Sequence, residues 1–212
     1  MDDRLTPALY LEFADSSPAE YAVERIPALL ARGGIERATW WEDCVPGRRD
    51  LPRTLPDART LGLYEIGAAF EPPIDTDRGI HMVRTSRPGQ GRLTGRPTVG
   101  LELVLISPRE DVSAQALRDW ADFVHLRHIA EATCDGFTMI TPYEHAAGGR
   151  PRFMHLYEMD TDAPEAAFQA MTPTVAARIG APGTPTFDAW AWHPALWIEY
   201  VSTFRLIGER SS

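Results

Sequence analysis

Two segments of this chain share one order of expected elements, and that repeat constrains the fold more than any other feature. In the first, an apolar strand at 8–13 precedes Ser17–Glu20 (Ser-Pro-Ala-Glu), which has the spacing of a helix capping box with proline at the first helical position. In the second, a β-prone run at 98–106 precedes Ser107–Glu110 (Ser-Pro-Arg-Glu) with the same spacing. We therefore expect two related units.

The later elements extend the repeat. Leu63–Ile66 (Leu-Tyr-Glu-Ile) closely matches Leu156–Met159 (Leu-Tyr-Glu-Met). In the first unit, the helix ends at Gly33-Gly34 and strands follow at 35–43 and 60–67. In the second, the pattern predicts a helix at 112–133, strands at 136–143 and 153–159, a helix at 163–179 and a strand at 196–206. A second helix is missing from the first unit, where only Pro72–Asp75 stands between strands.

The second unit reads β-α-β-β-α-β, the ferredoxin-like arrangement. The expected fold class is α+β, with tandem ferredoxin-like repeats whose antiparallel sheets form a fused, pseudo-dimeric α/β barrel. We place a degenerate first repeat and joining loop at 1–97 and the second repeat at 98–212, with Gly89–Pro97 as the loop. Closing two sheets into a barrel removes the edges that open sheets expose.

Two missing residue types narrow the chemistry. The 212 residues include no lysine and no asparagine, so all 21 basic residues are arginine. Without lysine, the chain cannot form a Schiff base, hold pyridoxal phosphate covalently or build a P-loop. No Gly-x-Gly-x-x-Gly motif follows a strand, and neither Gly-x-Ser-x-Gly nor Cys-x-x-Cys occurs. These absences disfavour nucleotide-dependent enzymes, elbow-type serine hydrolases and zinc fingers.

Charge and hydropathy indicate which partners and which cellular compartment to expect. The formal net charge of −9 argues against a nucleic-acid partner. No run approaches the roughly 18 apolar residues of a membrane span, and the first residues do not resemble a signal peptide. With only two cysteines, the sequence predicts a soluble cytoplasmic protein in a reducing compartment.

The long helix at 112–133 carries the first candidate for catalysis. Its apolar stripe, which should face the sheet, comprises Leu117, Trp120, Ala121 and Val124. Arg118, Asp122 and His125 fall on an adjacent stripe. An imidazole one turn from a carboxylate is a plausible acid–base unit. The alternative is a solvated face on which Asp122 pairs with Arg118.

The segment Trp120–Leu126 (Trp-Ala-Asp-Phe-Val-His-Leu) resembles the Trp-x-Asp-x-x-His-[aliphatic] signature of EthD-like proteins of the dimeric α/β-barrel superfamily. The resemblance covers about 98–209 and includes Gly136-Phe137 and Phe-x-His-Leu-Tyr-Glu at 153–158. It implies that His125 faces a pocket between helix and sheet. Related members are cofactor-free lyases, isomerases, cyclases or monooxygenases, and others bind haem. Arg25 stands at the histidine position of the first half, which implies a single working pocket in the second half.

The strand at 153–159 predicts one wall of that pocket. Side chains alternate across a strand, so one face carries Phe153, His155, Tyr157 and Met159. A face with histidine, tyrosine and methionine resembles a pocket wall, although Tyr157 could equally be a core tyrosine. Glu65 and Glu158 recur in both halves, which suggests a structural role.

Other candidates are open to two interpretations. His128 lies on the apolar stripe of the helix and is interpreted as a core histidine. Alternatively, it could bind a metal together with His125 and either His145 or His155, but we expect no metal. The Trp190 segment at 187–194 is either a lid over a planar ligand or aromatic packing in a homodimer interface.

We therefore expect a cofactor-independent lyase, isomerase or cyclase acting on a small aromatic, polyketide-like or lactone metabolite. His125 would be the acid or base, Asp122 would orient it, and Tyr157 would hold a substrate oxygen. Substrate-binding residues would be Trp120, His155, His128, Met159 and Trp190. The alternatives are a non-catalytic carrier of a hydrophobic ligand and a cofactor-free monooxygenase. No nucleic acid, membrane or cofactor is expected as a partner.

Overall fold

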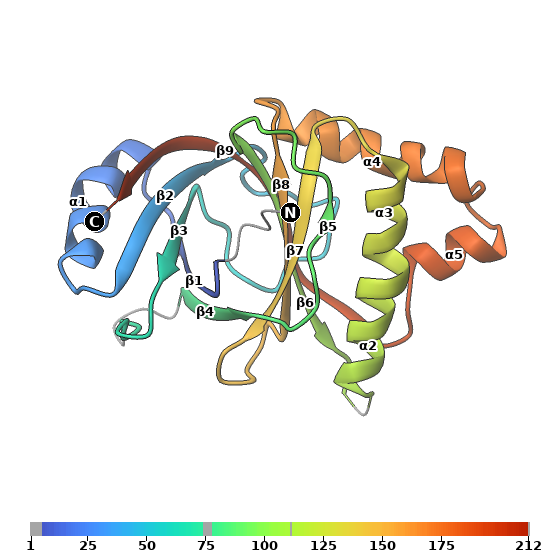
Figure 1. The fold of residues 1–212 in the computed structure, drawn as a ribbon, viewed down its shortest axis with the longest axis horizontal. Helices are drawn as coiled ribbons and strands as arrows, with labels where there is room; N and C mark the ends of the chain where they lie inside the picture. The colour runs from blue at the N-terminus through green and yellow to red at the C-terminus, as the bar shows by residue number, and fades with distance from the viewer. Residues whose placement is uncertain (1–5, 74–77, 111, 212) are drawn as a thin grey trace.

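The computed structural model describes residues 6–73, 78–110 and 112–211 (Figure 1). The elements of the first half are β1 (Ala8–Ala14), α1 (Pro18–Leu30), β2 (Ile35–Asp43), β3 (Thr60–Ile66) and β4 (Gly79–Arg84). A short strand, β5 (Gln90–Gly91), lies in the joining segment. The second half contains β6 (Gly100–Pro108), α2 (Ala114–Trp120), the π-helical turn η1 (Ala121–His125), α3 (Leu126–Ala132), β7 (Phe137–His145), β8 (Phe153–Met159), α4 (Pro164–Ile179), α5 (Pro185–Ala191) and β9 (Leu196–Ser211).

Eight of these strands form a closed antiparallel barrel. Their order is β4-β1-β3-β2-β9-β6-β8-β7, and β7 pairs with β4 to complete the ring, with β5 added along β7. Within each half the order is the same, because β4-β1-β3-β2 and β9-β6-β8-β7 both place their fourth, first, third and second strands in sequence. The predicted α+β barrel is therefore confirmed.

The interior of the barrel is a packed apolar core. Inward-facing side chains from both halves meet there, among them Leu11, Leu61, Leu103, Met154 and Phe204. Helices cover the outer faces: α1 packs on one side of the barrel, and α2 to α5 pack on the opposite side (Figure 1). Any site between helix and sheet must therefore lie outside the barrel.

The capping box at the start of α1 is confirmed. Ser17 accepts a hydrogen bond from the Glu20 backbone, and the Glu20 carboxylate accepts one from the Ser17 backbone. The corresponding prediction at Ser107–Glu110 is wrong. The β6–β9 ladder runs through Pro108, and the helix begins only after Ser113, whose side chain is the N-cap.

Two further predictions are corrected. The helix predicted at 112–133 is interrupted at η1, where the backbone widens to π-helical bonding. The stretch at 187–194, predicted as a lid or interface segment, begins within a short helix, α5. Thr184 caps α5 by accepting from the Phe187 backbone, so ordinary helix chemistry fixes this segment.

The sequence predicted no second helix in the first half, and none of residues 67–73 is helical. Ile74 and Asp75 lie outside the described residues. Within the ranges that the structure covers, no helix is both long and apolar enough to cross a membrane.

Candidate active site

A cavity of about 250 Å³ lies between the outer face of the second-half sheet and the helices that cover it. Strands β6, β8 and β9 form its floor, and α2, η1, α4 and α5 form its walls. The side chains that matter most chemically are Glu102, Trp120, His125, His155, Tyr157 and Trp190. The apolar remainder includes Val104, Phe168, Met171 and Phe187. Mostly apolar walls with a few convergent polar groups are typical of small-molecule sites.

The His125 ring is held by a hydrogen bond to a backbone carbonyl and by aromatic stacking. Its Nδ1 lies 3.0 Å from the carbonyl oxygen of Trp190, and its ring stacks on the Trp190 indole at 5.3 Å with an interplanar angle of 9°. A carbonyl can only accept, so Nδ1 must carry the proton. Burial lowers the pKa of the imidazole, which is therefore neutral near pH 7. Nε2 then carries the lone pair of a base.

Helix α5 forms a fixed wall of the cavity. The Trp120 Nε1 donates to the carbonyl of Ala189 at 2.7 Å. The Trp190 Nε1 donates to the carbonyl of His125 at 3.2 Å, which makes the Trp190–His125 contact reciprocal. The Trp190 side chain is buried, consistent with a wall and not with an exposed lid. The sequence predicted the participation of Trp190 but not this linkage.

Asp122 contacts neither of the partners that the sequence suggested. Its Oδ2 lies 3.0 Å from Nη1 of Arg87, which also binds Asp119. Its Oδ1 lies 4.0 Å from Nε2 of His155, while His125 bonds to Trp190 instead. Burial raises the pKa of Asp122, and Arg87 opposes that rise. Asp122 therefore lies near His155 without a hydrogen bond to it.

His155 and Tyr157 occupy the predicted face of β8 and both line the cavity. Burial lowers the pKa of His155 to about 3, so its imidazole stays neutral throughout the physiological range. Burial and the nearby Glu102 raise the pKa of Tyr157 well above its ordinary value. The phenol therefore keeps its proton and remains a hydrogen-bond donor.

Glu102 is a residue that the sequence reasoning missed. It lies opposite Tyr157 in the β6–β8 register and is 2 % exposed. Its Oε2 has no hydrogen-bond partner among the described residues, and burial raises the carboxyl pKa to about 8. At neutral pH the group is mostly a carboxylic acid, which can donate a proton. A lone glutamate inside the apolar run Leu-Glu-Leu-Val-Leu was the available signal.

Two predicted binding residues lie outside this cavity. His128 projects elsewhere, with Nδ1 3.3 Å from a guanidinium nitrogen of Arg178. Met159 is fully buried and is not part of the cavity lining. His125 and His128 therefore do not converge. Among the described residues, no group of three or more His, Cys, Asp or Glu side chains is placed to hold a metal ion.

The corresponding region of the first half is filled by side chains. The hydroxyls of Tyr21 and Tyr64 are 2.7 Å apart, and Tyr21 donates to Glu12 at 2.8 Å. Arg25, at the position matched to the helix histidine, binds the same carboxylate at 2.5 Å. Gly62 provides the space, because a Cβ there would lie 2.0 Å from the Tyr21 hydroxyl. This network links α1 to β1 and β3 through side chains.

Comparison with known proteins identifies the fold but not the family. No protein-family profile matches the chain, and no curated protein matches its sequence. Among solved structures, an anthrone oxidase-like protein superposes with a TM-score of 0.50 at 13 % identity, covering 96 % of this chain and 92 % of its own. A monooxygenase candidate from Fusobacterium nucleatum superposes with a TM-score of 0.53 at 6 % identity, covering 97 % and 94 %.

A mutant chlorite dismutase from Candidatus Nitrospira defluvii gives a TM-score of 0.51 at 7 % identity, covering 96 % of this chain and 92 % of that one. These identities are too low to carry function from one protein to another. At this level the likeness shows a shared fold, an α+β barrel of the dimeric α/β-barrel type. The chain therefore has the dimeric α/β-barrel fold, closed within one polypeptide.

Proposed function

We propose that this protein is a cofactor-independent enzyme that moves a proton on a small, neutral, aromatic substrate. The observation that carries the proposal is that His125 and Glu102 line the same, mostly apolar cavity. The first is a base whose tautomer is fixed by the Trp190 carbonyl, and the second is a buried acid. Such a pair can remove a proton at one substrate atom and donate one at another.

Each polar group has a distinct task in this proposal. Nε2 of His125 accepts a proton from a carbon next to a carbonyl, or from a hydroxyl. The Glu102 acid and the Tyr157 phenol donate hydrogen bonds to the substrate oxygen, where negative charge develops. His155, whose Nε2 lies 4.0 Å from Asp122 Oδ1, supplies a further neutral polar contact.

The cavity favours a flat, uncharged substrate. Its volume of about 250 Å³ lies just below the range of about 300–1,000 Å³ that is typical of drug-sized ligands. Trp120, Trp190 and Phe187 offer aromatic surface, and none of the titratable side chains in the lining carries a full charge near pH 7. A charged substrate would lose its hydration here without gaining a counter-charge.

Anthrone is a suitable probe, because it is flat and neutral and its methylene hydrogens are activated through the rings by a carbonyl. The experiment follows deuterium incorporation at that methylene by NMR in anaerobic D₂O buffer. We expect wild-type protein to accelerate the exchange and His125→Ala to lower the rate by roughly two or more orders of magnitude. His81→Ala, a histidine on β4 outside the cavity, is the matched control.

The alternatives give different results. A carrier would bind anthrone without accelerating exchange, and His125→Ala would change only the affinity. A cofactor-free monooxygenase would consume dissolved oxygen when air is admitted, and a haem protein would be coloured. Equal exchange rates for wild type and His125→Ala would refute the catalytic role of His125.

The finer assignments rest on the same observations. We propose that residues 1–97 and 98–212 are tandem ferredoxin-like repeats, which the shared strand order supports. The EthD-like resemblance of Trp120–Leu126 is supported by the position of Trp120 and His125 in the cavity lining. A cytoplasmic homodimer is also proposed. Trp192, at 58 % exposed, is one apolar side chain that a second copy could cover, and light scattering tests the oligomeric state.

A further inference from the structure

A second, larger cavity lies on the same side of the barrel, at the other end of the α2–α3 helix. Its volume is about 550 Å³, and it shares no lining residue with the first cavity. Its floor is β7, its side is the end of α3 with the turn at 133–136, and its cover is the joining segment at 90–96. The Phe137 ring, which lines it, packs edge-on against Tyr157 of the first cavity at 6.0 Å between centroids.

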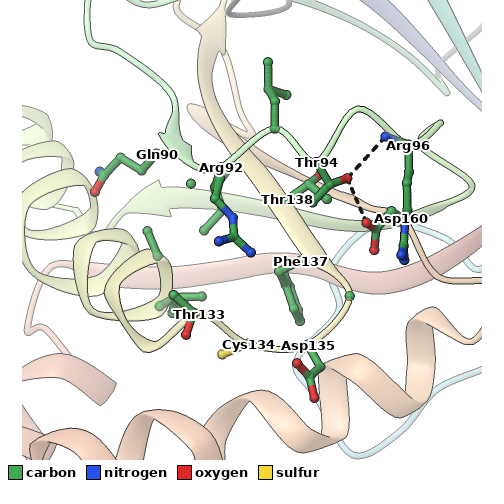
Figure 2. A pocket seen from close by; sticks show the side chains of 16 residues that line it. Gln90, Arg92, Thr94, Arg96, Thr133, Cys134, Asp135, Phe137, Thr138 and Asp160 are labelled. Carbon is green, nitrogen blue, oxygen red and sulfur yellow. Dashed lines mark hydrogen bonds between the residues drawn. The ribbon is translucent and has the colours of Figure 1, made fainter. Parts of the chain in front are cut away.

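The joining segment is anchored over this cavity on both sides. Gly91 pairs with Met139 of β7, and a Cβ at Gly91 would lie 2.2 Å from the carbonyl oxygen of Thr138. Only glycine permits that approach, and its φ of 134° is in the region that favours glycine. Farther along, Thr94 donates to the carboxylate of Asp160 at 2.8 Å (Figure 2). The cover is therefore held in place without a ligand.

Two arginines on this cover have no acidic partner among the residues that the structure describes. Arg92 and Arg96 both line the cavity, and neither guanidinium makes an ion pair with any residue that the structure describes. Figure 2 shows the Arg92 side chain directed from the segment toward Phe137. The nearby acids are Asp160, which Thr94 engages, and Asp135. In a chain of net charge −9, two arginines at a concave surface that pair with no acid in the described part of the chain are well suited to an anion.

The backbone at the cavity wall is unusual. Thr133 adopts the left-handed conformation, with φ 50° and ψ 50°, where it ends α3. Glycine or asparagine normally occupies such a position, and for a β-branched residue this conformation is an outlier. Strain of this kind concentrates at ligand-binding sites. Thr133 lines the cavity, so its side chain is available to a ligand.

We infer that this cavity is an accessory binding site for a small aromatic carboxylate. Arg92 binds the carboxylate, for which the planar guanidinium is matched in shape and charge. The ring of the ligand lies against the apolar floor that Phe137, Ile129 and Ile140 provide. The site thus differs in charge preference from the first cavity, whose titratable lining groups are neutral near pH 7.

The test uses 2-naphthoate and its neutral analogue of similar shape, 2-naphthamide. Binding is followed by NMR of isotope-labelled isoleucine methyl groups, because Ile129 and Ile140 line the accessory cavity whereas Ile106 and Ile198 line the first. We expect 2-naphthoate to shift Ile129 and Ile140, with a Kd in the millimolar range or tighter. 2-Naphthamide should bind at least tenfold more weakly.

Variants with the same change in charge locate the carboxylate. Arg92→Gln should raise the Kd for 2-naphthoate roughly tenfold or more, since it removes a charge-assisted hydrogen bond. Arg32→Gln, which removes an exposed arginine outside both cavities, should leave it unchanged. Equal affinities of the two variants would overturn the proposal. So would shifts confined to Ile106 and Ile198, or no saturable shift below about 10 mM.

Discussion

The acid in the first cavity makes a quantitative prediction about stability. Glu102 is 2 % exposed, its Oε2 lacks a hydrogen-bond partner among the described residues, and burial raises its pKa from 4.5 to about 8. Between these two values the folded state retains a proton that the unfolded chain releases. The free energy of unfolding must therefore fall as pH rises from 4.5 to 8 and level off above it.

The magnitude follows from the two pKa values. Each pH unit between them is equivalent to about 1.4 kcal/mol, so Glu102 lowers the free energy of unfolding by about 3–4 kcal/mol between pH 5 and pH 8. Glu102→Gln keeps the shape of the side chain and removes its titration. We therefore expect the variant to become more stable than wild type as pH rises, by that amount at pH 8 relative to pH 5.

Urea unfolding at several pH values between 5 and 8 measures this effect. The difference between variant and wild type is used, because every other titrating group contributes to both proteins. Parallel stability curves for the two proteins would refute the reasoning, because they would mean that Glu102 titrates alike in the folded and unfolded states.

The remaining predictions concern a second titrating group and the filled site of the first half. Burial lowers the pKa of His155 from 6.5 to about 3, so the unfolded chain takes up a proton as pH falls through 6.5 while the folded protein does not. Between pH 7 and 4.5, the free energy of unfolding should therefore fall by about 2–3 kcal/mol less for His155→Phe than for wild type, as measured by urea unfolding. An equal fall in both proteins would contradict this. Gly62→Ala should cost about 1–3 kcal/mol and lower the Tm, because the new Cβ would displace the buried Tyr21 hydroxyl. Gly67→Ala, where the nearest atom is the flexible end of Glu36, is its control, and equal Tm values would contradict the account.

Local chemistry and periodicity predicted most of the secondary structure. The capping box at Ser17–Glu20 contains its own hydrogen-bonding partners, and it formed as expected. The strand at 153–159 was predicted with the bounds that the structure shows, because its alternation and its flanking residues are local signals. The same reasoning was wrong at Ser107–Glu110, because pairing of β6 with β9 prevailed over a local capping preference.

The sequence predicted most of the residues in the candidate site but not the contacts between them. Trp120, His125, His155, Tyr157 and Trp190 line the cavity, as expected. The partner of Asp122 is Arg87, which lies between β4 and β5, far from Asp122 in the sequence. No spacing rule along the helix could have predicted that contact.

Two other features depended on tertiary structure. The π-helical turn at Ala121–His125 sets the directions of Asp122 and His125, and the apolar periodicity of the helix gave no sign of it. Glu102 was overlooked because one acidic residue in an apolar strand usually points to solvent. Here both faces of β6 are covered, so the carboxyl is buried.

The central claim is that His125 presents an unprotonated Nε2 to the cavity. Long-range ¹H–¹⁵N correlation of the histidine side chains tests it directly, with His125→Gln used to assign the signals. The account predicts a neutral ring with the proton on Nδ1, bonded to the Trp190 carbonyl, and a pKa below 6.5. A proton on Nε2 at neutral pH, or a pKa above 6.5, would contradict it.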